Sequence, residues 1–343
     1  MTNDATQTPK IDRETLKKLR ADLRGAALAL KPDEVRYLVD LYYQIQDYRI
    51  QAQGQDRAAQ VAVCGECGKE VAYKLRKRPT PAFLVAPHPV TGDGDEECPG
   101  SLEETGPKQQ PNALVSYVFE MFEGLEDEVK RALDHYTEGQ PVGVWLRSIR
   151  GIGPVISAGL IAHVYHLDPF PTSASHLMSF AGMNPDAKWE KGERRPWNAR
   201  LKTLVAYKLG ESFVKVHNHE EDFYGKLYAK RKRLEESRNE RLEFKDQAAA
   251  WLLKMKDKST EAFKAYSAGR LPKQHVHARA RRVAVKMFLS HYYTVCHFLR
   301  KGELGPRPYA LEHLPGHNDV VPIPCTDSVP GFAEALKAAG RAA

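Results

Sequence analysis

Long apolar runs are absent from this sequence of 343 residues. No stretch of about 18 consecutive apolar residues occurs, so we expect no transmembrane helix and no membrane partner. The segment Met1–Lys10 is polar, lacks the apolar core of a secretory signal and is expected to be disordered. Only five cysteines are present, and an odd number does not suit the disulfide framework of a secreted protein. These absences predict a cytoplasmic protein.

Acidic residues are missing from one long stretch of the chain. Lys and Arg exceed Asp and Glu by only 51 to 44, yet Arg270–Lys301 holds eight basic residues and no acidic one. Acidic residues gather elsewhere, at Glu120, Glu123, Glu126, Asp127 and Glu128. Charge that is separated in this way favours a basic face with an anionic partner.

Apolar residues at helical spacing dominate most of the sequence. They predict a helix over 11–30, a helix from Pro32 to about Ala62, and another from about Asn112 to 140. Prolines interrupt this pattern between 63 and 111, where Val71–Leu75 and Ala82–Ala86 favour short strands. We therefore expect a mainly α fold, made of a coiled-coil-like helical hairpin (11–62 and 112–140), a small zinc-ribbon-like β insertion (63–111), a helical domain (141–302) and an irregular tail (303–343) with a short helix at Gly331–Ala339.

The insertion carries a candidate metal site. Cys64-Gly-Glu-Cys67 resembles the first knuckle of a zinc ribbon, in which a tight turn lets two thiolates reach one tetrahedral ion. Cys98, before Pro99-Gly100, resembles a second knuckle, and His88 is the best fourth ligand, with Glu97 or Glu96 as substitutes. The alternatives are a redox pair or a degenerate ribbon without metal. A structural zinc is favoured because a small proline-rich insertion has little core of its own.

A second motif lies at Arg147-Ser-Ile-Arg-Gly-Ile-Gly-Pro154. Apolar helices flank Gly151 and Gly153, two glycines expected to adopt conformations that a Cβ would oppose. The pattern favours a helix-hairpin-helix, in which free amides at the start of the second helix meet a phosphate. Arg147 and Arg150 add charge, and Ile152 sits between the glycines. The alternative is a turn that serves packing alone.

Two further basic clusters follow. The first lies within Phe223–Lys264, which is so rich in Glu and Arg that it predicts a solvated helical excursion. The second has no acidic residues and is the better candidate for contacting phosphates. Its candidate residues are Lys273, Arg279, Arg281, Arg282 and Lys286. The aromatic residues that follow, from Phe288 to Phe298, have helical spacing and are expected in the core.

Five segments between Leu146 and Lys301 belong to one recognisable pattern: Ser148–Val155, Phe170–Pro185, Ala199–Leu204, Asp222–Tyr228 and Ala278–Phe288. Together they resemble the C-terminal domain of the insertion-sequence 110 transposases, the Piv/MooV recombinases. This resemblance covers less than half of the chain and implies DNA binding.

Two departures from that family affect the expected chemistry. The family has an N-terminal RuvC-like domain whose acidic residues hold magnesium, whereas the first 140 residues here show no strand-borne carboxylate set, so magnesium is not expected. The family also has a serine nucleophile after the segment ending at Pro185, where this chain has Trp189 or Glu190. The nearby Ser173, Ser175 and Ser179 are expected to cap or pack helices.

The sequence therefore predicts a nucleoid-associated protein that binds double-stranded DNA without catalysis of its own. One alternative is an active transposase or site-specific recombinase that uses an unrecognised serine or a partner nuclease chain. Another is a structural adaptor that recruits a protein. The sequence leaves open whether a structured RNA binds and whether the chain forms a homo-oligomer.

Overall fold

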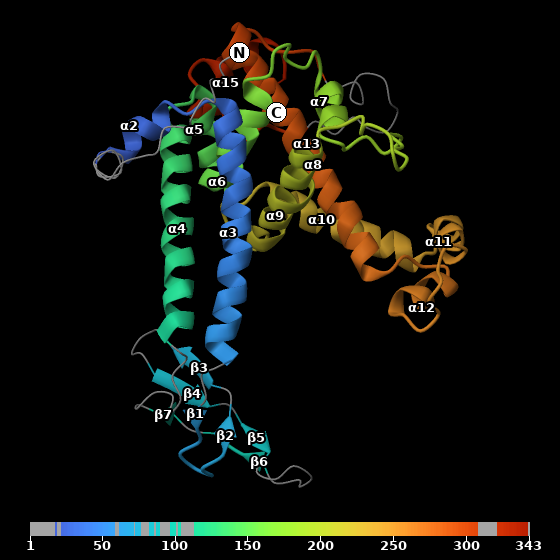
Figure 1. The fold of residues 1–343 in the computed structure, drawn as a ribbon. Coiled ribbons are helices and arrows are strands. Elements are labelled where there is room, and N and C mark those ends of the chain that lie inside the picture. Colours follow the sequence, from blue (N-terminus) through green and yellow to red (C-terminus); the bar gives the residue numbers. More distant parts are fainter. Residues whose placement is uncertain are drawn as a thin grey trace, which may run out of the picture. The chain divides into compact units, whose positions relative to one another are not determined.

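The computed structural model describes residues 18, 22–58, 62–71, 73–76, 82–85, 87–89, 97–100, 102–103, 113–307 and 321–341. These residues form mainly helices, and their short strands all lie between 62 and 103 (Figure 1). The predicted mainly α fold with a small β insertion is therefore confirmed. No helix in the described ranges is long and apolar enough to cross a membrane. Met1–Lys10, predicted to be disordered, lies outside these ranges.

Contacts between residues divide the chain into two compact units. One comprises Met1–Val39 and Arg131–Ala343, and the other is Asp40–Lys130. Two long helices, α3 (Pro32–Ala58) and α4 (Ala113–Glu138), each contribute residues to both units. We refer to Asp40–Lys130 as the insertion unit and to the rest as the helical unit.

The helical arms of the insertion unit lie side by side and run in opposite directions (Figure 1). The rings of Tyr48 and Phe122 stack across them with centroids 5.7 Å apart. Helix α3 ends at Ala58, earlier than the predicted Ala62, which instead begins a strand. The start of α4 at Ala113 agrees with the prediction.

Three small antiparallel sheets make up the β part of the insertion unit. Strand β1 (Ala62–Val63) pairs with β2 (Glu70–Val71), and β5 (His88–Pro89) pairs with β6 (Glu97–Cys98). The third sheet has the strand order β3-β4-β7, made of Tyr73–Arg76, Ala82–Val85 and Leu102–Glu103. The two predicted β-prone runs thus contribute to strands, and the pairing of β5 with β6 sets His88 opposite Cys98.

The helical unit is a succession of short helices around one long one, α13 (Lys273–Lys301). Its other elements, in chain order, are α2 (Leu23–Leu28), α5 (Pro141–Ser148), α6 (Pro154–Leu160), the π-helix η1 (Ile161–Tyr165), α7 (Ala174–Phe180), α8 (Ala199–Thr203), the π-helix η2 (Leu204–Leu209), α9 (Gly210–Val216), α10 (Tyr224–Glu240), α11 (Lys245–Leu252), α12 (Glu261–Ser267), the 3₁₀ helix η3 (Thr326–Ser328) and α15 (Phe332–Ala338). Of the helix predicted over 11–30, the described part is α2, and its N-terminus is capped by the Asp22 carboxylate.

Aromatic side chains build the core of the helical unit. Trp145 of α5 is fully buried and stacks on Phe288 and Tyr292 of α13, with ring centroids 5.9 and 6.2 Å away. The predicted core role of the aromatic residues on α13 agrees with this packing. The tail also packs onto the core, because the Trp145 indole donates a hydrogen bond to the Pro324 carbonyl and Phe332 is buried against Phe298.

The charged segment Phe223–Lys264 is helical but not simply solvated. Helices α10 to α12 enclose a second, smaller core built from Phe244, Ala248, Tyr266, Leu271 and Val276. Glu235 is fully buried beneath it and forms ion pairs with Arg231 and Arg279. Part of the charge that suggested a solvated face is thus neutralised inside the protein.

Candidate metal centre and nucleic-acid interface

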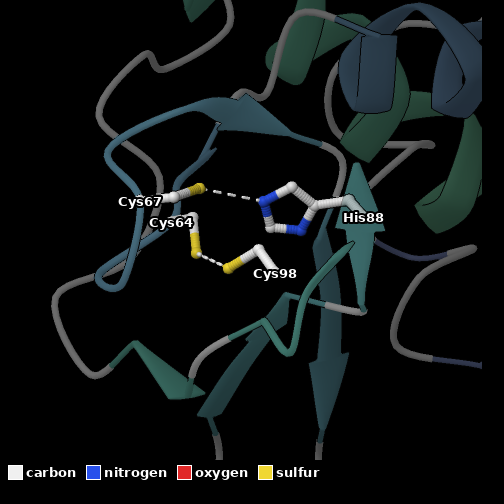
Figure 2. Close-up of side chains that lie close together, drawn as sticks. All are labelled: Cys64, Cys67, His88 and Cys98. Carbon is white, nitrogen blue, oxygen red and sulfur yellow. Dashed lines mark hydrogen bonds between the residues drawn. The ribbon is translucent and has the colours of Figure 1, made fainter. Parts of the chain in front are cut away.

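One turn and one strand pair of the insertion unit bring the predicted metal ligands together. In the turn the Gly68 amide donates to the Cys64 carbonyl at 2.8 Å, and Gly68 has a φ of +70°, which favours glycine. In the strand pair, His88 on β5 faces Cys98 on β6. Figure 2 shows the three thiols and the imidazole pointing toward a common centre.

The distances between the ligand atoms suit one tetrahedral ion. All four lie within 4.8 Å of one another. The Sγ atoms of Cys64 and Cys98 are 3.7 Å apart, and Cys67 Sγ is 3.1 Å from His88 Nε2. Two thiolates at about 2.3 Å from a tetrahedral zinc would be separated by about 3.8 Å. The cluster can therefore hold a metal ion, and its three sulfurs and one nitrogen are compatible with zinc.

Burial and hydrogen bonding act on the thiols in opposite directions. Cys64 and Cys98 are almost fully buried, and Cys67 and His88 are half-buried. The backbone amide of Lys69 lowers the pKa of the Cys67 thiol. The pKa of the Cys98 thiol is raised, because the backbone amide of Gly100 lowers it less than burial and the neighbouring thiols raise it. Of the two substitutes for His88, Glu97 is not part of the cluster, and Glu96 lies outside the described residues.

The helix-turn-helix segment of α5 and α6, which we call the α5–α6 hairpin, turns at Gly151. This glycine has a φ of +91°, and a Cβ on it would lie 3.2 Å from Val216 and 3.3 Å from Ser212 of α9. Gly153 differs from the prediction: its φ of −87° is open to any residue, and a Cβ there would meet nothing within 4 Å. Gly151 therefore serves the turn, whereas Gly153 leaves open space at the start of α6.

Of the other predicted residues of the hairpin, some stabilise the turn and one is exposed at the surface. Ile152 is buried, and its carbonyl accepts a hydrogen bond from Arg147, which also pairs with Asp134 at 3.2 Å. Arg147 thus braces the turn. Arg150 is exposed, and its guanidinium lies 2.7 Å from Nε2 of His219. Within the described residues no side chain caps the first turn of α6.

The basic residues of α13 are divided in the same way. Arg279 pairs with Glu235 at 2.8 Å, and Arg281 pairs with Glu211 of α9. Lys273 and Arg282 are exposed, and Lys286 is half-buried. Burial, and then the positive charge of Arg282, lower the pKa of Lys286. The positive surface of α13 therefore rests on Lys273, Arg282 and Lys286 more than on Arg279 and Arg281.

A further basic surface was not predicted. Residues 184–198, which we call the basic-aromatic loop, place Arg195 over the ring of Trp189 and approach Lys202, which lies over Trp197. In the sequence, Pro185 ends a segment that resembles the transposase family, and Trp189 or Glu190 stands where that family has a serine. The signal that marks it is the Arg194-Arg195 pair between two tryptophans.

A known family matches most of the hairpin and most of this loop. Residues 145–195 match the transposase IS116/IS110/IS902 family. The match to this transposase family begins in α5, passes through the hairpin and α7, and ends in the basic-aromatic loop. It confirms the predicted resemblance and indicates a transposase-related role. No curated protein and no solved structure matches the chain.

Proposed function

We propose that this chain binds double-stranded DNA through the α5–α6 hairpin, which acts as a helix-hairpin-helix, and that it has no catalytic activity of its own. The observation that carries the proposal is the position of the transposase-family match. Its 145–195 span begins within α5 and contains the turn, with Gly151 and Gly153, and all of α6.

The hairpin supplies the chemistry that phosphate binding needs. Amide groups at the start of α6 carry the partial positive charge of a helix N-terminus, and Gly153 leaves space for a backbone phosphate to approach them. Arg150 adds a full charge at the surface of the turn. Such contacts position a protein on duplex DNA without reading its bases.

Two observations support the absence of catalysis. Ser173, a serine near the family's nucleophile position, caps α7 by accepting a hydrogen bond from the His176 amide. The matched segment itself runs through Trp189 and Glu190, neither of which carries a hydroxyl or thiol that could attack a phosphodiester.

The metal centre completes the proposal. A structural zinc bound by Cys64, Cys67, Cys98 and His88 would stabilise the insertion unit. Thiolates and a neutral imidazole that fill all four tetrahedral positions leave no open site for a water or a substrate, which is typical of a structural zinc.

Duplex binding is tested by fluorescence anisotropy across a salt series, with magnesium present and the DNA recovered on a denaturing gel. Gly153→Val should weaken binding by about tenfold or more, since the added Cβ meets no atom of the chain within 4 Å and would occupy the space proposed for the phosphate. Arg150→Gln should reduce the salt dependence by about one phosphate contact. Lys258→Gln, an exposed charge outside the family match, is the control.

Unchanged affinity in the Gly153→Val variant would contradict the hairpin as the binding element. Cleaved or joined DNA strands would contradict the absence of catalysis and support an active recombinase. The helix content of the Gly153→Val variant, measured by circular dichroism, should match that of the unmodified protein, because a Cβ at Gly153 meets no atom of the chain within 4 Å.

A further inference from the structure

The basic-aromatic loop forms a cavity that the hairpin does not use. The cavity has a volume of about 490 Å³, within the range of small-ligand sites. Its walls combine apolar, aromatic and cationic side chains: Phe180, Arg194, Arg195, Pro196, Trp197 and Asn198. Flat rings beside guanidinium groups are the combination that recognises a nucleobase next to its phosphate.

Hydrogen bonds hold the walls of this cavity in place. The backbone N–H of Asn198 donates to the Phe180 carbonyl at 2.9 Å. The side-chain oxygen of Asn198 caps α8 by accepting from the backbone N–H of Leu201. The Trp189 indole donates to the Glu193 carbonyl at 2.7 Å, which closes the exposed part of the loop on itself. The aromatic residues thus sit on a built surface, although most of the loop is exposed.

Cationic side chains lie over the aromatic rings of this loop. Lys202 Nζ lies 4.0 Å from the centre of the Trp197 ring, and the Arg195 guanidinium lies 4.8 Å from that of Trp189. Burial, and then the charge of Arg195, lower the pKa of Lys202. In the described part of the chain, no carboxylate forms an ion pair with Arg194 or Arg195. The loop also carries Asp186, Glu190 and Glu193, so its unpaired positive charge is concentrated at Arg194, Arg195 and the neighbouring Lys202. These three side chains would favour a bound anion.

We propose that this cavity binds an unpaired nucleotide of single-stranded DNA. The base lies against Trp197 and Phe180, and Arg194 and Arg195 contact the flanking phosphates. A paired base cannot stack there, because its faces are covered by its neighbours in the duplex. An acidic peptide would satisfy the arginines but would leave the aromatic wall without a stacking partner.

This inference rests on the proposed DNA binding and adds a second site to it. Separate probes and variants test the two sites. The probe is an oligothymidylate of about 16 nucleotides, followed by anisotropy and by quenching of tryptophan fluorescence. Trp197→Ala should weaken its binding about tenfold, the effect of losing one stacked base, and should reduce the quenching. Trp197→Phe should restore most of the affinity. Blunt duplex should bind both variants as it binds the unmodified protein.

A second variant keeps the test independent of folding. Arg194→Gln with Arg195→Gln changes two exposed side chains and should weaken oligothymidylate binding by a similar factor, whereas Lys258→Gln should not. Unchanged oligothymidylate affinity in both the tryptophan and the arginine variants would overturn the proposal. Much tighter binding of an oligouridylate of the same length would overturn the assignment to DNA. A Gly153→Val variant that loses duplex binding but keeps oligothymidylate binding would support a separate site in the basic-aromatic loop.

Discussion

The β part of the insertion unit and the helical unit are stabilised by different means. Among the described side chains of the β part, the buried cluster consists of Cys64 and Cys98, with Cys67 and Val71 packed against it. The helical unit buries large aromatic residues such as Trp145. The centre of the β part is thus formed by candidate metal ligands and not by large apolar side chains. We therefore expect the β part to depend on a bound metal and the helical unit to be stable without one.

Loss of the metal should have the largest effect on this comparison. Cys64→Ser should reduce bound zinc from about one ion per chain to none and unfold the β part, because structural zinc contributes about 10–16 kcal/mol in zinc-finger peptides. Zinc is measured by mass spectrometry, and unfolding by hydrogen exchange of residues 62–103. All four tryptophans lie in the helical unit, so tryptophan fluorescence should stay unchanged.

The control for this prediction is Cys325→Ser, which changes an exposed thiol outside the cluster. A protein that keeps its zinc, or its exchange protection, without Cys64 would show that the β part does not depend on the metal centre.

Removal of a core aromatic side chain should have the next largest effect, and in the other unit. Trp145→Ala should destabilise the helical unit by about 3–5 kcal/mol, because it leaves a cavity beside Phe288 and Tyr292 and removes the bond to the Pro324 carbonyl. Urea denaturation followed by the remaining tryptophans measures this change. Val144→Ala, at an exposed position of the same helix, should cost little. Zinc loss in the Trp145→Ala variant would show that the two units depend on each other.

The sequence predicts local features of this chain well. The cysteine knuckles depend on a few adjacent residues, and the structure brings Cys64, Cys67 and Cys98 together as the spacing suggests. The first turn of α3 at Pro32 and the conformation of Gly151 are local in the same sense. Such features depend on the residue types of a few neighbouring positions, which can be read from one sequence.

Long-range pairings could not be predicted. Among the acidic residues between 120 and 128, only Glu126 is buried, since Tyr42, Gln46 and Arg49 meet it from a helix about 80 positions earlier. Arg281 was predicted as a phosphate contact but pairs with Glu211 on another helix. Which charges are exposed depends on tertiary packing, and helical periodicity does not report it.

Acidification should have a moderate effect on the helical unit. Burial, and then the charges of Arg36 and Arg200, lower the pKa of His163 to about 4, from 6.5 in an unfolded chain. The neutral imidazole is stabilising above pH 6.5, and this contribution is lost as the pH falls to about 4, because the unfolded chain takes up the proton first. The shift corresponds to about 3 kcal/mol at most.

His163→Leu should therefore flatten the decline of stability between pH 6.5 and 4, measured by tryptophan fluorescence in urea. This signal excludes the metal centre, which also releases its ion in acid but contains no tryptophan. His176→Gln, an exposed histidine, should keep the original slope. An equally steep decline in the His163→Leu variant would mean that His163 is not responsible for it.

A mutation in the helical arms of the insertion unit should have the smallest effect. Glu126 accepts hydrogen bonds from Tyr42 and Gln46, each at 3.0 Å, and pairs with Arg49 at 2.5 Å. Glu126→Gln keeps the size of the side chain but removes its charge, so we expect a loss of about 1 kcal/mol. Glu123→Gln, an exposed neighbour, should have no measurable effect. Hydrogen exchange in α3 and α4 measures both. Equal protection in the two variants would show that the charge of Glu126 does not stabilise the arms. The metal centre would then be the main difference between the two units.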